Sequence, residues 1–212
     1  MNPTQFFRSY EFLVDRADAF FAKMEKGYGS CINCKRHCSD CCQAVFGLFL
    51  IESAYIKSRF DQLDPDTRKQ AILRCNEADR GLKRLETKLE INNGDPEAQS
   101  SIMAKERIRC PLLDDNEDCI LYTNRPITCR VYGAPTRIHG KVRACSRSGF
   151  KAGERYPVFD LDGTYRELYL LSREFLSTAG DADPEKASLL ISVSKAIRTP
   201  LEELVYEIFR RG

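Results

Sequence analysis

The apolar positions in the first part of the chain recur at helical spacing. Across residues 4–26 the hydrophobic side chains return every three or four positions, which predicts an amphipathic helix. Gly27 and Gly29 follow, and we expect them to end it. A short apolar run over residues 44–50 then leads into a second predicted helix that ends near Phe60. The segment between these two helices is rich in cysteine, so we expect them to hold it from both sides.

A third, longer helix is predicted from Pro65 to about Glu90. Asp64 is a suitable N-cap, and a proline is favoured in the first turn. Cys75 falls on the apolar stripe of this helix, and we interpret it as a small buried residue and not a ligand. Residues 91–100 contain Asn-Asn-Gly-Asp-Pro, which predicts a flexible loop.

In the second half of the chain the helical pattern gives way to short β-prone pieces and then returns. Turn residues such as His139-Gly140 separate short β-prone pieces over 119–122, 127–132 and 136–138. Helical patterns return over 165–177, 183–197 and, with Pro200 in the first turn, 201–210. The predicted fold class is mainly α, with helices packed around a cysteine-rich, irregular metal-binding centre that contains short β pieces.

Length and composition favour a single domain over residues 1–212, and its many cysteines make it a candidate metal-binding domain. Within it we place the cysteine-cluster region at about 31–150 and the C-terminal helices at 164–211. A chain of 212 residues, 42% of them hydrophobic, can bury one substantial core. No stretch approaches the roughly 20 apolar residues of a membrane span, and no signal sequence is visible, so we expect a soluble, cytoplasmic protein without a membrane partner. The net charge of +2 does not favour nucleic acid as a partner either.

Nine of the ten cysteines form two sets, and these are the candidate metal ligands. In a reducing compartment such a count favours metal or redox chemistry over disulfides. Pairs separated by two or three residues can turn back onto one ion, whereas they are poorly placed to close disulfide loops. The candidates are Cys31, Cys34, Cys38, Cys41, Cys42, Cys110, Cys119, Cys129 and Cys145.

The spacing of the two sets limits how they can bind. Cys41 and Cys42 are adjacent, and neighbouring side chains usually diverge, so one mononuclear ion does not readily take both. Cysteines of the second set have eight, nine and fifteen residues between them, so they must converge through the fold. Nine thiolates match two four-coordinate centres with one left over, or one such centre and an iron-sulfur cluster. Zinc or iron is the expected cofactor in either case, because both accept tetrahedral thiolates.

Eight basic residues lie between Arg125 and Arg155, against the single acid Glu154. They are expected to neutralise anionic thiolate centres, to form a solvated basic face, or to bind nucleic acid. Arg130 follows Cys129 directly and is the best candidate for neutralisation.

Other chemical motifs are weaker. The spacing Cys-x3-Cys-x2-Cys ending at Cys41 also occurs in radical S-adenosylmethionine enzymes, but the flanking segments predict helices and not their partial α/β barrel. His37 and His139 are expected to be exposed turn residues, since thiolates are in excess. Glu52 is interpreted as a helix-start carboxylate, with a ligand or acid-base role as the alternative. The Asp-Leu-Asp-Gly run over 160–163 predicts a β-turn and not a calcium loop.

Taken together, three cysteine motifs resemble a bacterial family of zinc- or iron-chelating cysteine-cluster domains, often called YkgJ-like. The motifs are Cys-x3-Cys-x2-Cys-Cys ending at Cys42, Cys-Pro-Leu-Leu from Cys110, and Cys-Ile-Leu-Tyr-x2-Arg-Pro-x2-Cys-Arg-x-Tyr from Cys119. The resemblance implies ligand roles for Cys38, Cys41, Cys42, Cys110, Cys119 and Cys129, with Cys34 or Cys31 in the leading position. One branch of the family resembles flagellin lysine methylases.

Three functions follow from these observations. The leading hypothesis is a metal-binding protein that coordinates zinc or an iron-sulfur cluster through its thiolates, in a structural, storage or electron-transfer role. The alternatives are a cluster-dependent enzyme, such as a protein methylase, and a zinc-organised interaction module. The sequence identifies neither catalytic residues nor a protein partner.

Overall fold

The fold is mainly α, as predicted, with one small sheet. The computed structural model describes residues 4–35, 37–178, 180 and 183–203, and the statements below concern these residues. The helices are α1 (Thr4–Tyr28), α2 (Leu50–Phe60), α3 (Pro65–Ile91), α4 (Pro96–Lys105), α5 (Ile127–Val131), α6 (Leu161–Ser177), α7 (Pro184–Ser188) and α8 (Val193–Arg198). The strands are β1 (Thr136–Ile138), β2 (Lys141–Arg143) and β3 (Phe159–Asp160), and the short 3-10 turns are η1 (Gly29–Cys31), η2 (Asp40–Cys42) and η3 (Tyr122–Asn124).

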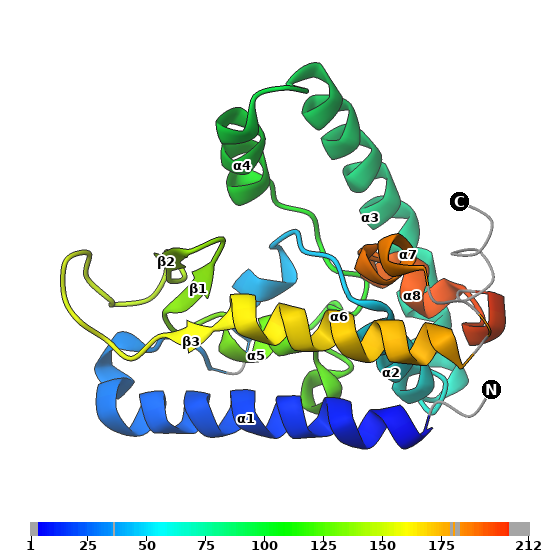
Figure 1. Ribbon diagram of the computed structural model, residues 1–212, viewed down its shortest axis with the longest axis horizontal. Coiled ribbons are helices and arrows are strands. Elements are labelled where there is room, and N and C mark those ends of the chain that lie inside the picture. The colour runs from blue at the N-terminus through cyan, green and yellow to red at the C-terminus, as the bar shows by residue number, and fades with distance from the viewer. Residues whose placement is uncertain (1–3, 36, 179, 181–182, 204–212) are drawn as a thin grey trace.

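Helices α1 and α6 run antiparallel along the length of the molecule, and α5 lies beside them (Figure 1). Their apolar faces pack ring against ring: Phe6 meets Phe175 at 5.4 Å between centroids. At the other end of α6, Phe159 meets Phe20 at 5.2 Å. The predicted helix over 4–26 is thus confirmed, although it continues past Gly27 to Tyr28. Helix α1 packs against α5, which carries Cys129.

Helix α3 confirms the predicted long helix and its cap. Asp64 accepts a hydrogen bond from the backbone N–H of Thr67 at 2.9 Å, and Cys75 is fully buried on the stripe. The C-terminal part of α3 and all of α4 project from the rest of the molecule (Figure 1). The prediction of a loop over 91–100 was wrong from Pro96 onwards, because Asp95 caps α4 by accepting from Ala98 N–H.

The three strands form a sheet in the order β2-β1-β3. β1 is antiparallel to β2, with Thr136 opposite Arg143, and parallel to β3, with Thr136 opposite Phe159. The predicted turn at His139-Gly140 is present, and both residues have positive φ, as a tight hairpin turn requires. The Asp162 carboxylate accepts hydrogen bonds from both turn amides, at 2.8 and 2.9 Å.

Three further predictions were wrong in detail. Residues 127–131 form a helix and not a β piece. Helix α6 begins at Leu161 and not at Tyr165, because Asp160 caps it, so the Asp-Leu-Asp-Gly run is a helix start and not a β-turn. The predicted helix over 183–197 is broken into α7 and α8 by an antiparallel bridge between Ile191 and Leu48, whose amides and carbonyls bond at 2.8 Å.

The remaining C-terminal prediction, a helix over 201–210, lies largely outside the described residues, which end at 203. Within the described part of the chain, every helix is too short or too polar to cross a membrane.

Candidate metal centre

The first cysteine set lies in the connection between α1 and α2. Cys31 ends the η1 turn, Cys34 and Cys38 lie in an irregular loop, and Cys41 and Cys42 belong to η2. The backbone N–H of Cys42 donates to the carbonyl of Ser39 at 2.9 Å, which closes this last turn. The turn holds the two adjacent cysteines, of which Cys42 is buried and Cys41 partly buried.

Backbone pairing brings the second set to the first. Residues 42–44 run antiparallel to 107–110: Cys110 N–H donates to the Cys42 carbonyl at 2.7 Å, and Ala44 bridges Arg107. The chain then reverses over 113–119, where the carboxylate of Asp114 accepts from the amides of residues 116 and 118. Cys110 and Cys119 therefore both face η2.

Cys129 is delivered by helix α5, whose start is fixed by a buried carboxylate. Glu52, at the start of α2, accepts hydrogen bonds from Ile127 N–H at 3.2 Å and from the Tyr10 hydroxyl at 3.4 Å. Its second oxygen accepts from Phe49 N–H at 3.4 Å. A carboxylate at these N-termini is favoured by the helix dipole. Glu52 thereby ties α1 and α2 to the cysteine-bearing helix, and burial raises its pKa to about 7.

Five thiols meet in what we call the inner thiol group: Cys41, Cys42, Cys110, Cys119 and Cys129. Hydrogen bonds from the thiols of Cys129 and Cys42 lower the pKa of Cys41 to about 3. A further hydrogen bond joins Cys42 to Cys119 and lowers the pKa of Cys119. The pKa of a donor thiol shifts the other way: the pKa of Cys129 is raised by its hydrogen bond to Cys41 and by burial. Four sulfurs thus form a continuous chain, and burial raises the pKa of the fifth, Cys110, to about 12.

The inner thiol group borders a cavity of about 60 Å³. All five cysteines line it, together with Arg125 and apolar side chains that include Phe46, Leu82 and Val193. Cys42 is only 8% exposed, and the other four are partly buried. Thiolates in an apolar, poorly hydrated setting of this size suit a soft ion better than a hydrated one.

A second set, the outer thiol group, comprises Cys34, Cys38 and Cys145. Their thiols interact electrostatically, and burial, followed by these neighbours, raises the pKa of Cys34 to about 12. Asp40 adds a carboxylate: its Oδ2 accepts from the Cys145 thiol at 3.2 Å, and its Oδ1 pairs with Arg147 Nε at 3.3 Å. Sequence reasoning missed Asp40, although its position between Cys38 and Cys41 could have indicated it.

Cys31 lies apart from both groups. Its carbonyl accepts from Gly149 N–H at 2.8 Å, and its thiol interacts with Tyr156. Cys34 is held on its other side by Gly133, where a Cβ would come within 2.1 Å of the sulfur. The geometry therefore favours Cys34 over Cys31 in the leading motif position.

The donor set fits zinc or iron in chemistry, though the side chains are not yet in ligand positions. Within the described ranges, no three Cys, His, Asp or Glu side chains are already arranged to hold an ion. In the inner thiol group the sulfurs are joined by S–H hydrogen bonds, so binding requires the loss of these protons and small side-chain rotations. Soft thiolates brought together in this way are the ligands that zinc and iron-sulfur centres use.

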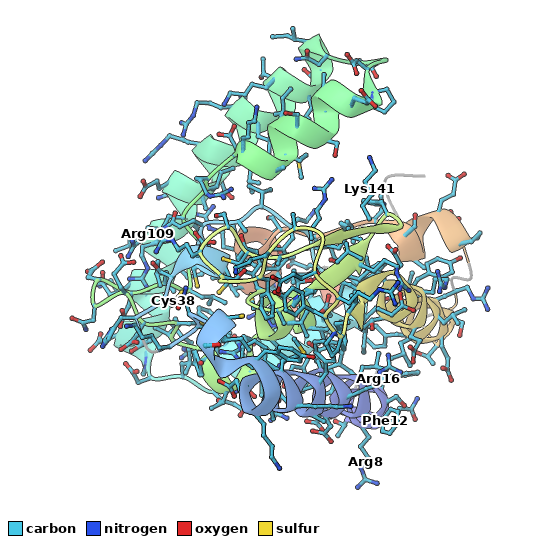
Figure 2. All side chains as sticks on the ribbon, turned by 90° about the vertical axis from the view of Figure 1, so that its left-hand side faces the viewer. Arg8, Phe12, Arg16, Cys38, Arg109 and Lys141 are labelled. Atoms are coloured by element: carbon cyan, nitrogen blue, oxygen red, sulfur yellow. The ribbon has the colours of Figure 1, made fainter. Side chains whose placement is uncertain are left out.

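The prediction that Arg130 neutralises the thiolates was wrong. Its guanidinium bonds to the carbonyls of Arg125 and Thr123 at 2.8 and 2.5 Å and pairs with Asp18 at 2.5 Å. Arg125 lines the inner cavity instead. Most of the other basic residues in this region form a solvated face, and Lys141 points away from the molecule (Figure 2).

Both histidines lie in turns, as predicted. His37 and His139 are exposed and have positive φ, and His37 Nδ1 lies 3.2 Å from the Asn116 carbonyl oxygen. The Glu52 carboxylate accepts hydrogen bonds from two backbone amides and the Tyr10 hydroxyl. Its role in the structure is therefore to join α1, α2 and α5 and not to face the cavity.

A comparison with protein families places the cysteine motifs in a known group. Residues 33–146, more than half of the chain, match the family described as "CxxCxxCC: Putative zinc- or iron-chelating domain". Neither the curated proteins nor the solved structures include a match to the chain. The matched segment contains both thiol groups and excludes Cys31. The chain belongs to the CxxCxxCC family of zinc- or iron-chelating domains.

Proposed function

We propose that the protein binds zinc or iron through the inner thiol group, and that the bound ion holds the irregular segment 107–131 against η2. The observation that carries this proposal is the convergence of five thiols, from three separate segments, on one cavity. Four thiolates complete a tetrahedral site, and the fifth can bridge or exchange. An ion there would supply cross-links between segments that are otherwise joined by few backbone hydrogen bonds.

The outer thiol group is proposed as a secondary donor set. It offers three thiols and the Asp40 carboxylate, and its members Cys34 and Cys145 are partly exposed. A site of this kind binds less tightly than an all-thiolate site in an apolar setting, because water competes for the ion. We therefore expect a first ion at the inner thiol group and a weaker second ion at the outer one.

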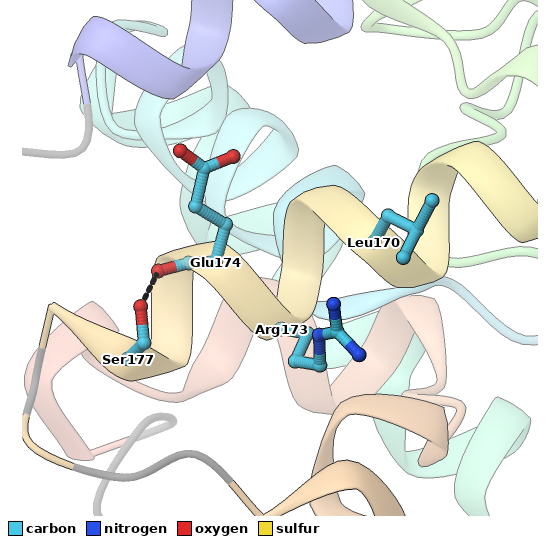
Figure 3. Close-up of a pocket in the computed structure, with 4 residues that line it drawn as sticks. All are labelled: Leu170, Arg173, Glu174 and Ser177. Atoms are coloured by element: carbon cyan, nitrogen blue, oxygen red, sulfur yellow. Dashed lines mark hydrogen bonds between the residues drawn. The ribbon is translucent and has the colours of Figure 1, made fainter.

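A cluster-dependent methylase is less well supported by the cavities. The inner cavity of about 60 Å³ is far below the roughly 300–1,000 Å³ of pockets that enclose drug-sized ligands. A larger hollow of about 520 Å³ lies on α6, but Leu170, Arg173, Glu174 and Ser177 line it, and it contains no cysteine (Figure 3). Neither cavity combines a cofactor-sized volume with the thiols.

Metal analysis of anaerobically purified protein tests the proposal. We expect at least one zinc or iron ion per chain, and acid-labile sulfide together with visible absorption would identify an iron-sulfur cluster. Replacement of Cys41 and Cys129 by serine should remove the tight ion, whereas replacement of Cys34 and Cys145 should leave it. Protein that takes up no metal after reduction and incubation with zinc or ferrous iron would refute the proposal.

Limited proteolysis tests the structural role of the ion. Chelation should accelerate cleavage within residues 107–131, while α1 and α6 stay protected by their own packing. Equal cleavage rates with and without metal would show that the ion does not hold this segment.

A further inference from the structure

Arg125 is a partly buried cation at the edge of the inner thiol group. Its side chain lines the inner cavity, and its Cζ lies 4.1 Å from the centroid of the Tyr122 ring. The Nε atom is buried and has no hydrogen-bond partner among the described residues. Over the same residues, no carboxylate forms an ion pair with this guanidinium. Partial burial of a charge without a carboxylate partner costs free energy, which a nearby thiolate would offset.

The thiols are the anionic partners within reach. Arg125 interacts electrostatically with Cys41 and Cys129 of the inner thiol group. It also interacts with Cys119 and, in the outer thiol group, with Cys34. The other arginine at this cavity, Arg109, is already paired with Glu117 at 2.6 Å.

The backbone of Arg125 is held in place by the second arginine of the same motif. Arg130 Nε donates to the Arg125 carbonyl at 2.8 Å, and the ion pair with Asp18 fixes Arg130 in turn. Arg130 is only 6% exposed. The two arginines of the Arg-Pro-x2-Cys-Arg motif therefore have different roles. Arg130 anchors the turn, and Arg125 places a cation at the cavity.

We propose that Arg125 is the charge-compensating residue of the metal centre, and that its guanidinium offsets the net negative charge of a metal-thiolate site. Four thiolates on a divalent ion carry a net charge of about −2, which one adjacent cation reduces by half. A bound ion requires all of its ligating thiols to be deprotonated at once, so the need for a neighbouring cation is greatest in the metal-bound state. This inference rests on the proposed function, since it names the residue that tunes that same site.

Substitution of Arg125 by methionine separates this role from simple packing. Methionine keeps the length of the side chain but removes the charge, so zinc affinity should fall by about 10–100-fold, as expected for a residue that supports a metal site. The metal-free protein should keep its fold with little change in its denaturation midpoint, because fewer thiolates face Arg125 when no ion is bound. Arg125→Lys, which keeps the charge, should retain zinc affinity within a few-fold of the wild type.

Competition between the protein and a chromogenic chelator for zinc measures the affinity, and urea unfolding in the presence of EDTA and a reductant measures metal-free stability. Arg143→Met is the matched control: Arg143 lies on the exposed strand β2, so neither quantity should change. Arg125→Met with wild-type zinc affinity, or with a less stable or unfolded metal-free state, would overturn the inference, as would Arg125→Lys as weak as Arg125→Met. Failure of the wild type itself to bind zinc or iron would instead refute the proposed function.

Discussion

Substitution of Glu52 by glutamine is the most informative single test of how the helices are joined. The carboxyl group is 2% exposed and lies between α1, α2 and α5. Burial raises its pKa from the ordinary value of 4.5 to about 7, against the opposing effect of the hydrogen bonds from Ile127, Phe49 and Tyr10. The folded protein therefore binds a proton at Glu52 that the unfolded chain releases between these two pH values.

The sign of the pH dependence follows from this difference. The folded state binds more protons than the unfolded state between pH 4.5 and 7, so the contribution of Glu52 to the free energy of unfolding falls as the pH rises. The loss amounts to about 3 kcal/mol across that range, since one pH unit corresponds to 1.36 kcal/mol. The contribution is fully present below pH 4.5 and is lost above pH 7.

Urea unfolding of reduced, metal-free protein at several pH values from 4.5 to 8 measures this effect. Glu52→Gln does not titrate, so its stability relative to the wild type should rise by about 3 kcal/mol over the range. At low pH the variant should be the less stable protein, because the glutamine amide faces the Phe49 N–H as a second donor. Thiol titrations occur in both proteins and cancel in the difference.

Glu167→Gln is the matched control, since Glu167 is a half-exposed residue on α6 that pairs with Arg16 at 2.6 Å. The pH-dependent change in stability should be larger for Glu52→Gln than for Glu167→Gln. A flat curve for Glu52→Gln would refute the reasoning. A relative loss of stability at high pH would show that the hydrogen bonds outweigh the burial of the charge.

Three further substitutions test other parts of the structure. Cys75→Ala should leave the bound metal per chain unchanged in elemental analysis, because Cys75 is buried on α3 and donates to the Ala71 carbonyl. Arg130→Gln should lower the free energy of unfolding by about 2–3 kcal/mol in urea titrations, as expected for the loss of hydrogen bonds to a buried charged group; a change below 0.5 kcal/mol, roughly that of a surface substitution, would contradict the anchoring role. Gly133→Ala should displace Cys34 and speed the alkylation of its thiol, because the new Cβ would collide with the sulfur. Gly27→Ala is the control: it lies in open space on α1 and should be neutral or stabilising by roughly 1 kcal/mol. Equal alkylation rates of Cys34 in the two variants would contradict the close contact.

Much of the helical framework could be predicted from the sequence because its causes are local. Apolar spacing alone specifies α1, and the Asp64-Pro65 cap specifies the start of α3. The same cap-and-proline signal is present at Asp95-Pro96, where loop composition concealed it. The cysteine motifs could likewise be recognised from the sequence, since their spacing is a property of the chain and not of the fold.

Contacts between distant segments decided the rest. Residues 127–131 carry β-prone side chains, yet they form a helix whose first N–H is bonded by Glu52, 75 positions earlier. The helix predicted over 183–197 is broken by pairing with Leu48. Local propensity is worth only a few tenths of a kcal/mol per residue, so one buried hydrogen bond or strand bridge can override it.

The sequence by itself determined the chemistry of this protein: many thiols, in motifs that identify a metal-chelating family. Only the tertiary structure decided how those thiols are divided, with five around one cavity, three in the outer thiol group, and Cys31 apart. It also decided that Arg125 and not Arg130 faces the thiols. The physical reason is that the direction of a side chain depends on contacts between distant segments, such as Arg130 and Asp18, which are 112 residues apart. Spacing along the chain does not encode such contacts.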